Sequence, residues 1–127
     1  MKTIKILIAD DRPVFLLGLR AIINQMDECF IVDIASDGKR AYKLICKIIP
    51  DLVILDIDMP HLNGIQIANK LGESHPRIKI VFLTVNKDES IFNFAFRSGA
   101  RGYVLKDNAA KDSLYFEIVR FVFISRA

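Results

Sequence analysis

Side chains capable of chemistry follow directly after the apolar runs of this sequence. The carboxylates of Asp10 and Asp11 follow the first run, and Asp56 follows a run rich in β-branched residues. Thr84 ends a later run, and Lys106 ends another. Short apolar runs of this kind are typical of strands buried in a parallel sheet, where ligands bind beyond the carboxyl ends of the strands. We therefore expect these side chains to surround one crevice.

The grouped carboxylates predict a site for a hard cation. Carboxylates that lie close together repel one another unless a cation neutralises them, and Mg²⁺ prefers oxygen ligands. Mg²⁺ also retains bound water, which leaves room for phosphate oxygens. Because a carboxylate can act as the nucleophile in phosphoryl transfer, Asp56 is a candidate phosphoryl acceptor. Thr84 and Lys106 would then hold the oxygens of the transferred group.

The plainer interpretation of each residue alone is a solvated polar group at a strand end. Asp58, two residues after Asp56, can likewise be an ordinary turn residue before Pro60. Taken singly, each residue favours that interpretation. The order Asp-Asp, Asp, Thr and Lys at successive strand ends is specific enough to favour a shared site.

The elements that position these residues alternate between strand and helix. Strands are expected at residues 4–9, 30–35, 52–55, 79–84 and 101–106. The first helix begins at Pro13 with Asp11 as its expected N-cap, the fourth closes at Gly99, and a last helix is expected at 111–124. This alternation predicts an α/β fold, a doubly wound five-stranded parallel sheet with helices on both faces.

Length and composition fit one globular domain. The chain has 127 residues, with 52% hydrophobic and 26% charged, which is an ordinary globular balance. The apolar runs are too short to cross a bilayer and no secretory signal is visible, so we expect a cytoplasmic protein with no membrane partner. Cys29 and Cys46 lack metal-site spacing, which favours reduced thiols over a disulfide.

One predicted helix carries much of the net charge of +3. Its basic residues are Lys39, Arg40, Lys43 and Lys47. A charge of this size favours a solvated helix face over a nucleic-acid-binding surface.

At these motifs the sequence resembles the receiver domain of bacterial two-component response regulators. The resemblance covers almost the whole chain, and it implies a single receiver domain over residues 1–127 with a flavodoxin-like strand order of 2-1-3-4-5. Four segments carry it: Ile8-Ala9-Asp10-Asp11, Leu55 to Pro60 with Asn63-Gly64, Leu83-Thr84, and Gly99 to Lys106. The resemblance implies a phosphoacceptor signalling domain rather than an enzyme.

The resemblance also implies a role for each acidic residue. Asp56 would accept a phosphoryl group from a sensor histidine kinase. Asp11 and Asp56 would bind Mg²⁺ through their side chains. Asp58 would contribute its backbone carbonyl to the same metal site, and Asp10 would act through a water molecule.

The remaining motif residues match the parts of the family that respond to phosphorylation. Thr84 and Tyr103 match the switch pair, and Lys106 matches the lysine that contacts the phosphoryl group. Tyr103 also has a plainer interpretation as an aromatic residue on an edge strand, but its position three residues before Lys106 favours the switch role.

Two departures from the common receiver pattern resemble the LuxR-type transcription factors. Asp107 follows Lys106 where many receivers have proline, and Asp11-Arg12-Pro13 opens the first helix. Members of that subgroup carry a helix-turn-helix domain after a linker, so any DNA contact would be made by an output domain absent from this chain. An excised domain and a stand-alone receiver both remain open interpretations.

The fourth and last predicted helices carry more apolar residues than one sheet-facing stripe needs. In the fourth helix these are Ile91, Phe92, Phe94 and Phe96, and in the last helix Leu114, Tyr115, Phe116, Ile118, Val119, Phe121, Val122, Phe123 and Ile124. We expect the excess to form a partner surface beside Tyr103, either for a homodimer or for a DNA-binding domain.

Two alternatives to a phosphoacceptor remain at this point. Asp56-Ile57-Asp58 also fits the Asp-x-Asp fragment of haloacid-dehalogenase-type phosphatases, although Pro60 and the short chain argue against that fold. The other alternative is a receiver-like interaction module that is never phosphorylated, and the complete acidic site argues against it.

Overall fold

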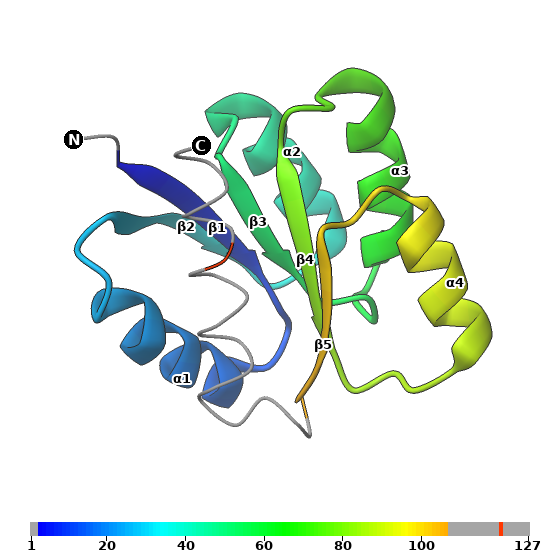
Figure 1. The fold of residues 1–127 in the computed structure, drawn as a ribbon, viewed down its shortest axis with the longest axis horizontal. Coiled ribbons are helices and arrows are strands. Elements are labelled where there is room, and N and C mark those ends of the chain that lie inside the picture. The colour runs from blue at the N-terminus through cyan, green and yellow to red at the C-terminus, as the bar shows by residue number, and fades with distance from the viewer. Residues whose placement is uncertain (1–2, 107–119, 121–127) are drawn as a thin grey trace.

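The computed structural model of the protein describes residues 3–106 and residue 120. Strands and helices alternate along these residues (Figure 1). The strands are β1 (Ile4–Ala9), β2 (Cys29–Ala35), β3 (Leu52–Leu55), β4 (Lys79–Thr84) and β5 (Gly102–Leu105). The helices are α1 (Pro13–Asn24), α2 (Gly38–Ile48), α3 (Gly64–Ser74) and α4 (Glu89–Arg97). Apart from residue 120, the last helix expected from the sequence lies outside the described residues.

The five strands form one parallel sheet in the order β2-β1-β3-β4-β5, which confirms the flavodoxin-like order. The central strands β1 and β3 pair in a register that sets Ala9 beside Leu55. Their last residues are therefore neighbours, and the backbone N–H of Asp56 donates to the carbonyl of Ala9 at 2.9 Å. This register brings Asp10 and Asp56 to adjacent strand ends although 46 positions separate them in the sequence.

Helices cover both faces of the sheet, as Figure 1 shows for α1 on one face and for α2 and α3 on the other. The core on the α1 face includes the buried residues Ile8, Leu19, Ile23, Ile54 and Leu83. The core on the opposite face includes Ile45, Leu55, Ile67, Phe82 and Ala95, from strands and from α2, α3 and α4. Burying a single aliphatic or aromatic side chain of this kind contributes roughly 1.5–3 kcal/mol, so the two cores fix the strand ends firmly.

The loop between β3 and α3 is held by close approaches of glycine to backbone. A Cβ atom on Gly64 would overlap the carbonyl oxygen of Asp56, and one on Gly38 would overlap the carbonyl of Leu62. The N–H of Gly64 donates to the carbonyl of Ile57 at 2.9 Å. These contacts fix the backbone immediately after Asp56 against the starts of two helices.

The start of α1 differs from the expectation. Arg12 is its N-cap and makes no side-chain capping bond, so the assignment of Asp11 as the cap was wrong. Instead, Oδ1 of the neighbouring Asp10 accepts the backbone N–H of Arg12 at 2.9 Å. The side chain of Asp11 is exposed.

Within the described part of the chain, no helix combines the length and apolar character needed to cross a bilayer.

Candidate functional site

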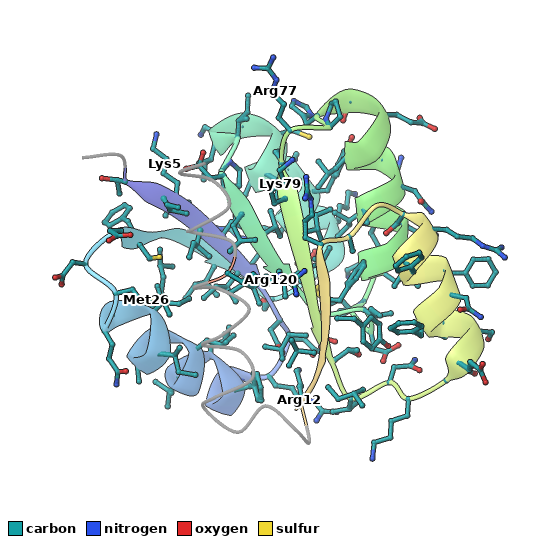
Figure 2. The ribbon with its side chains drawn as sticks, viewed as in Figure 1. Lys5, Arg12, Met26, Arg77, Lys79 and Arg120 are labelled. Carbon is teal, nitrogen blue, oxygen red and sulfur yellow. The ribbon has the colours of Figure 1, made fainter. Side chains whose placement is uncertain are left out.

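Three carboxylates meet at the carboxyl edge of the sheet. Asp10 and Asp11 follow β1, Asp56 follows β3, and one oxygen from each lies within 4.8 Å of the others. Figure 2 shows Arg12, the neighbour of Asp11, at this edge of the sheet and Lys5 at the opposite edge. The structure therefore brings together the acidic residues that the sequence placed in one crevice.

An ammonium group joins the cluster from the end of β5. Nζ of Lys106 lies 2.6 Å from Oδ2 of Asp10 and 3.2 Å from Oδ2 of Asp56. The Lys106 side chain is only 5% exposed, so solvent screens these contacts poorly. The ammonium group neutralises part of the negative charge of the buried carboxylates.

Burial governs the charge of Asp56. Asp10 and Asp56 are 1% and 4% exposed. Desolvation raises the pKa of Asp56, and the negative charge of Asp10 raises it further, while Lys106 acts in the opposite direction. The pKa of Asp56 therefore lies above its ordinary value despite the ion pair, because removing the carboxylate from water outweighs the attraction of one ammonium.

The donor set fits a hard divalent cation. Oδ1 of Asp56 is buried and has no hydrogen-bond partner among the described residues, which is unusual for a carboxylate oxygen. Oδ2 of Asp10 contacts Lys106 as an ion pair without hydrogen-bond geometry. Three carboxylates and one ammonium carry two net negative charges, and Asp11 opens the cluster to solvent. Oxygen ligands, excess negative charge and access from water are the properties that Mg²⁺ sites share.

Asp58 lies in the loop after β3, and its side chain is exposed and outside the carboxylate cluster. Its backbone N–H acts to lower the pKa of Asp56. The carboxylate of Asp58 therefore does not belong to the cluster. The resemblance implies a metal contact through its backbone carbonyl instead.

Thr84 and Tyr103 contact the same residue, Asn86, at the start of the loop before α4. Thr84 is fully buried, and its Oγ1 accepts the backbone N–H of Asn86 at 3.2 Å. The Tyr103 hydroxyl donates to the carbonyl of Asn86 at 2.8 Å. The Tyr103 ring also lies edge-on to Phe92 of α4, with ring centroids 5.0 Å apart. These contacts connect the end of β4 to the first turn of α4.

Aromatic side chains are exposed along α4. Phe92, Phe94 and Phe96 are 43%, 55% and 73% exposed. A groove of about 270 Å³ beside them is lined partly by Phe92, Phe96 and Tyr103. The excess apolar surface expected beside Tyr103 is therefore present on α4, while the corresponding residues of the last predicted helix lie outside the described part of the chain.

Two contacts at the site were not foreseen from the sequence. The ring of Phe15 faces Nζ of Lys106, with 4.7 Å from the nitrogen to the ring centroid. In the sequence, Phe15 is only an apolar residue near the start of the first expected helix. Asn86, the shared partner of the switch pair, gave no sequence signal because its role depends on the path of the loop.

The family of the chain is decided by its match to a family model. The model of the response regulator receiver domain matches residues 6–115. The chain belongs to this family. The receiver domain is a signalling domain of two-component systems, and the acidic cluster at the carboxyl edge of the sheet occupies the region where the motifs of the resemblance fall.

Curated relatives place the chain beside LuxR-type regulators. It is 39% identical over 120 residues to the oxygen regulatory protein NreC of Staphylococcus carnosus, covering 94% of this chain and 54% of that protein. It is 35% identical over 104 residues to the transcriptional regulatory protein DegU of Brevibacillus brevis, covering 82% and 44%. The chain thus spans about half the length of the curated relatives it matches.

Solved structures agree with that placement. A DNA-binding response regulator of the LuxR family from Staphylococcus aureus superposes with a TM-score of 0.85 at 27% identity, covering 92% of this chain and 97% of that one. The RcsB response regulator of Salmonella typhimurium gives a TM-score of 0.87 at 26% identity, covering 95% and 62%. Neither these relatives nor the family match supports a phosphatase of the haloacid-dehalogenase type.

Proposed function

We propose that Asp56 accepts a phosphoryl group from a phosphohistidine of a sensor histidine kinase, in a reaction that depends on Mg²⁺. The observation that carries this proposal is the buried Oδ1 of Asp56, which has no hydrogen-bond partner within residues 3–106 and 120 and lies near two further carboxylates and the Lys106 ammonium. A carboxylate oxygen of Asp56 forms the new bond to phosphorus. The phosphorus–nitrogen bond of the donor breaks, and the imidazole leaves with the electron pair.

The neighbouring residues have distinct parts in this proposal. Asp11 and Asp56 would hold Mg²⁺ through their side chains, Asp58 through its backbone carbonyl, and Asp10 through water. When bound, Mg²⁺ neutralises negative charge on the incoming phosphoryl oxygens. Lys106, already 3.2 Å from Asp56, needs only a small displacement to donate to one of those oxygens.

The response to phosphorylation begins at Thr84. Its hydroxyl turns from Asn86 to donate to a phosphoryl oxygen, which releases the backbone N–H of Asn86. Tyr103, held by the carbonyl of the same residue, then loses its anchor and moves inward. Support comes from the two hydrogen bonds that converge on Asn86 and from the contact between Tyr103 and Phe92. A local charge would in this way bias a two-state element.

The output of the switch is a change in the α4 surface. Exposed Phe92, Phe94 and Phe96 provide an apolar area that suits a second receiver or a DNA-binding domain of the kind found in LuxR-family regulators. Contact with DNA would be made by the output domain alone.

Mass spectrometry of the intact chain tests the proposal. The chain is incubated with Mg²⁺ and a small phosphodonor such as acetyl phosphate, with a chelator in the matched control. A stable gain of one phosphoryl group only with Mg²⁺ is the expected result. Rapid multiple turnover without a stable adduct would indicate a phosphatase instead, and an unchanged mass would indicate an interaction module that is not phosphorylated.

A further inference from the structure

The Lys106 ammonium lies between carboxylates on one side and an aromatic ring on the other. Oxygens of Asp10 and Asp56 lie 2.6 Å and 3.2 Å from Nζ. The ring of Phe15, from the first turn of α1, has its centroid 4.7 Å from the same nitrogen. Of these three contacts of the Lys106 ammonium, only the contact with Phe15 is made to an uncharged side chain.

The ring can interact with an N–H donor of the ammonium group that the two carboxylates do not use. An ammonium group has three N–H donors, and two carboxylates do not use all of them. Because the Lys106 side chain is 5% exposed, little water reaches the remaining donor. The negative face of an aromatic ring attracts a cation at this distance, and the attraction is stronger where water is excluded.

Phe15 is itself fixed in place. Pro13 occupies the first turn of α1, and the backbone N–H of Phe15 donates to the carbonyl of Arg12 at 3.1 Å. The ring also packs against the buried cluster on the α1 face of the sheet. A flexible four-carbon side chain that meets a fixed ring has fewer conformations to sample.

We infer that Phe15 is a positioning residue. It holds the Lys106 ammonium beside the Asp56 carboxylate, where the ammonium can contact the phosphoryl oxygens. This inference rests on the proposed function, because the aimed ammonium has a role only if Asp56 carries a phosphoryl group. Phe15 touches no reacting atom and acts through Lys106 alone.

The affinity for beryllofluoride, which mimics a phosphoryl group on a carboxylate, measures this role. Titrations at saturating Mg²⁺ compare the parent chain with Phe15→Leu and with a ring-fluorinated phenylalanine at the same position. Loss of the aromatic face should weaken binding roughly tenfold. The fluorinated ring keeps nearly the same shape but has a weaker negative face, so it should weaken binding in the same direction. Phe15→Tyr, which keeps the face, should restore most of the affinity.

A double-mutant cycle separates positioning from ordinary packing. In a Lys106→Met background, Phe15→Leu should cause no further loss of beryllofluoride affinity, because its only route to the site has been removed. Tyr42→Leu is the matched control, since it removes a similar contact with Lys70, 5.6 Å from the Tyr42 ring centroid and away from the site. That control should bind as tightly as the parent.

The outcomes distinguish this inference from the proposed function. A parent chain that fails to bind beryllofluoride would overturn the proposed function. Parent-like affinity in both Phe15→Leu and the fluorinated variant, or an equal loss with and without Lys106, would overturn the role of Phe15. If Phe15→Leu fails to fold, the fluorinated variant carries the test.

Nuclear magnetic resonance of the free chain gives an independent test. The Phe15 ring should shift the Cε protons of Lys106 upfield, and Phe15→Leu should abolish that shift.

Discussion

At Asp56, the ionised form that the proposed chemistry requires is the form that burial disfavours. Its carboxylate must be ionised to act as a nucleophile, yet burial raises its pKa and the adjacent Asp10 adds repulsion. Lys106 offsets these effects only in part. The fold therefore holds a carboxylate whose charged form is disfavoured, so a cation that neutralises this charge binds more favourably.

Asp56→Asn should stabilise the metal-free chain at neutral pH. The amide removes an ionised group whose folded-state pKa is raised, and Lys106 keeps Asp10 as its partner. The ionisation penalty is complete above the folded-state pKa and absent below the unfolded value of about 3.9. The gain in unfolding midpoint should therefore shrink as the pH falls through the raised pKa toward that value.

Thermal unfolding in the presence of a chelator measures this effect across the pH series. Asp27→Asn, at an exposed position between α1 and β2, serves as the control and should leave the midpoint nearly unchanged. A lower midpoint for Asp56→Asn at neutral pH would show that the Asp56–Lys106 ion pair outweighs desolvation.

At the scale of elements, the loops after β3 and β4 join the site to the rest of the fold. Gly64 holds the first loop by a backbone approach that no other residue permits without displacement. Asn86 holds the second loop through Thr84 and Tyr103. Each loop thus connects a strand end that carries site chemistry to the first turn of the next helix.

Gly64→Ala should lower the free energy of unfolding by roughly 1–3 kcal/mol, the usual range for overpacking. The added methyl group would overlap the carbonyl oxygen of Asp56, so phosphorylation by a small donor should slow as well. Gly72→Ala, inside α3, is the matched control because its Cβ meets only the Ser98 carbonyl oxygen at 3.9 Å. A helix-interior change of that kind is expected to stabilise by about 0.5–1 kcal/mol. Equal denaturant midpoints for the two variants would contradict the proposed constraint.

Thr84→Ala should accept a phosphoryl group but transmit less of the change to Tyr103. The alanine cannot donate to a phosphoryl oxygen, and it also leaves the Asn86 N–H without its acceptor, which costs about 1 kcal/mol of stability. Resonances of the Tyr103 ring, recorded before and after phosphorylation, report the coupling. Thr84→Ser keeps the hydroxyl and should preserve the shift. Identical shifts at Tyr103 in Thr84→Ala and the parent would refute the coupling.

The strands and the residues at their ends were predictable because burial and chain direction determine both. An apolar run such as Leu52–Leu55 identifies a buried strand, and parallel strands place Asp56 and Thr84 at a common edge. The contact between Phe15 and Lys106 was not predictable, since helical periodicity says which face a residue occupies but not what lies opposite. The cap of α1 was misassigned because Asp11 was chosen for its side-chain chemistry, whereas Pro13 begins the helix and the cap position therefore falls on Arg12.

In the whole molecule, a series of side-chain contacts joins the site to the α4 surface. The route between them runs from Thr84 through Asn86 and Tyr103 to Phe92. The three exposed phenylalanines of α4 are unusual for a free surface, and such patches commonly mark contacts with a partner.

Phosphorylation should promote self-association through α4. Analytical ultracentrifugation over a concentration series, with and without phosphodonor, is expected to show a larger sedimentation coefficient for the phosphorylated chain. Phe96→Glu, at a side chain 73% exposed, should prevent this shift without blocking phosphorylation. Leu17→Glu, at a 70% exposed side chain of α1, is the matched control and should still associate. A strict monomer in every state would exclude a second receiver and leave an output domain as the partner of α4.

In the proposed reaction, the carboxylate of Asp56 receives the phosphoryl group. The most direct measurement treats the phosphorylated chain with borohydride, which reduces an acyl phosphate to an alcohol, and locates the modified residue by tandem mass spectrometry. Homoserine is expected at position 56 in the parent, only after incubation with Mg²⁺ and phosphodonor, and no reduced residue is expected in Asp56→Asn. Homoserine at position 10 or 11 in the parent, or undiminished phosphoryl incorporation in Asp56→Asn, would contradict it.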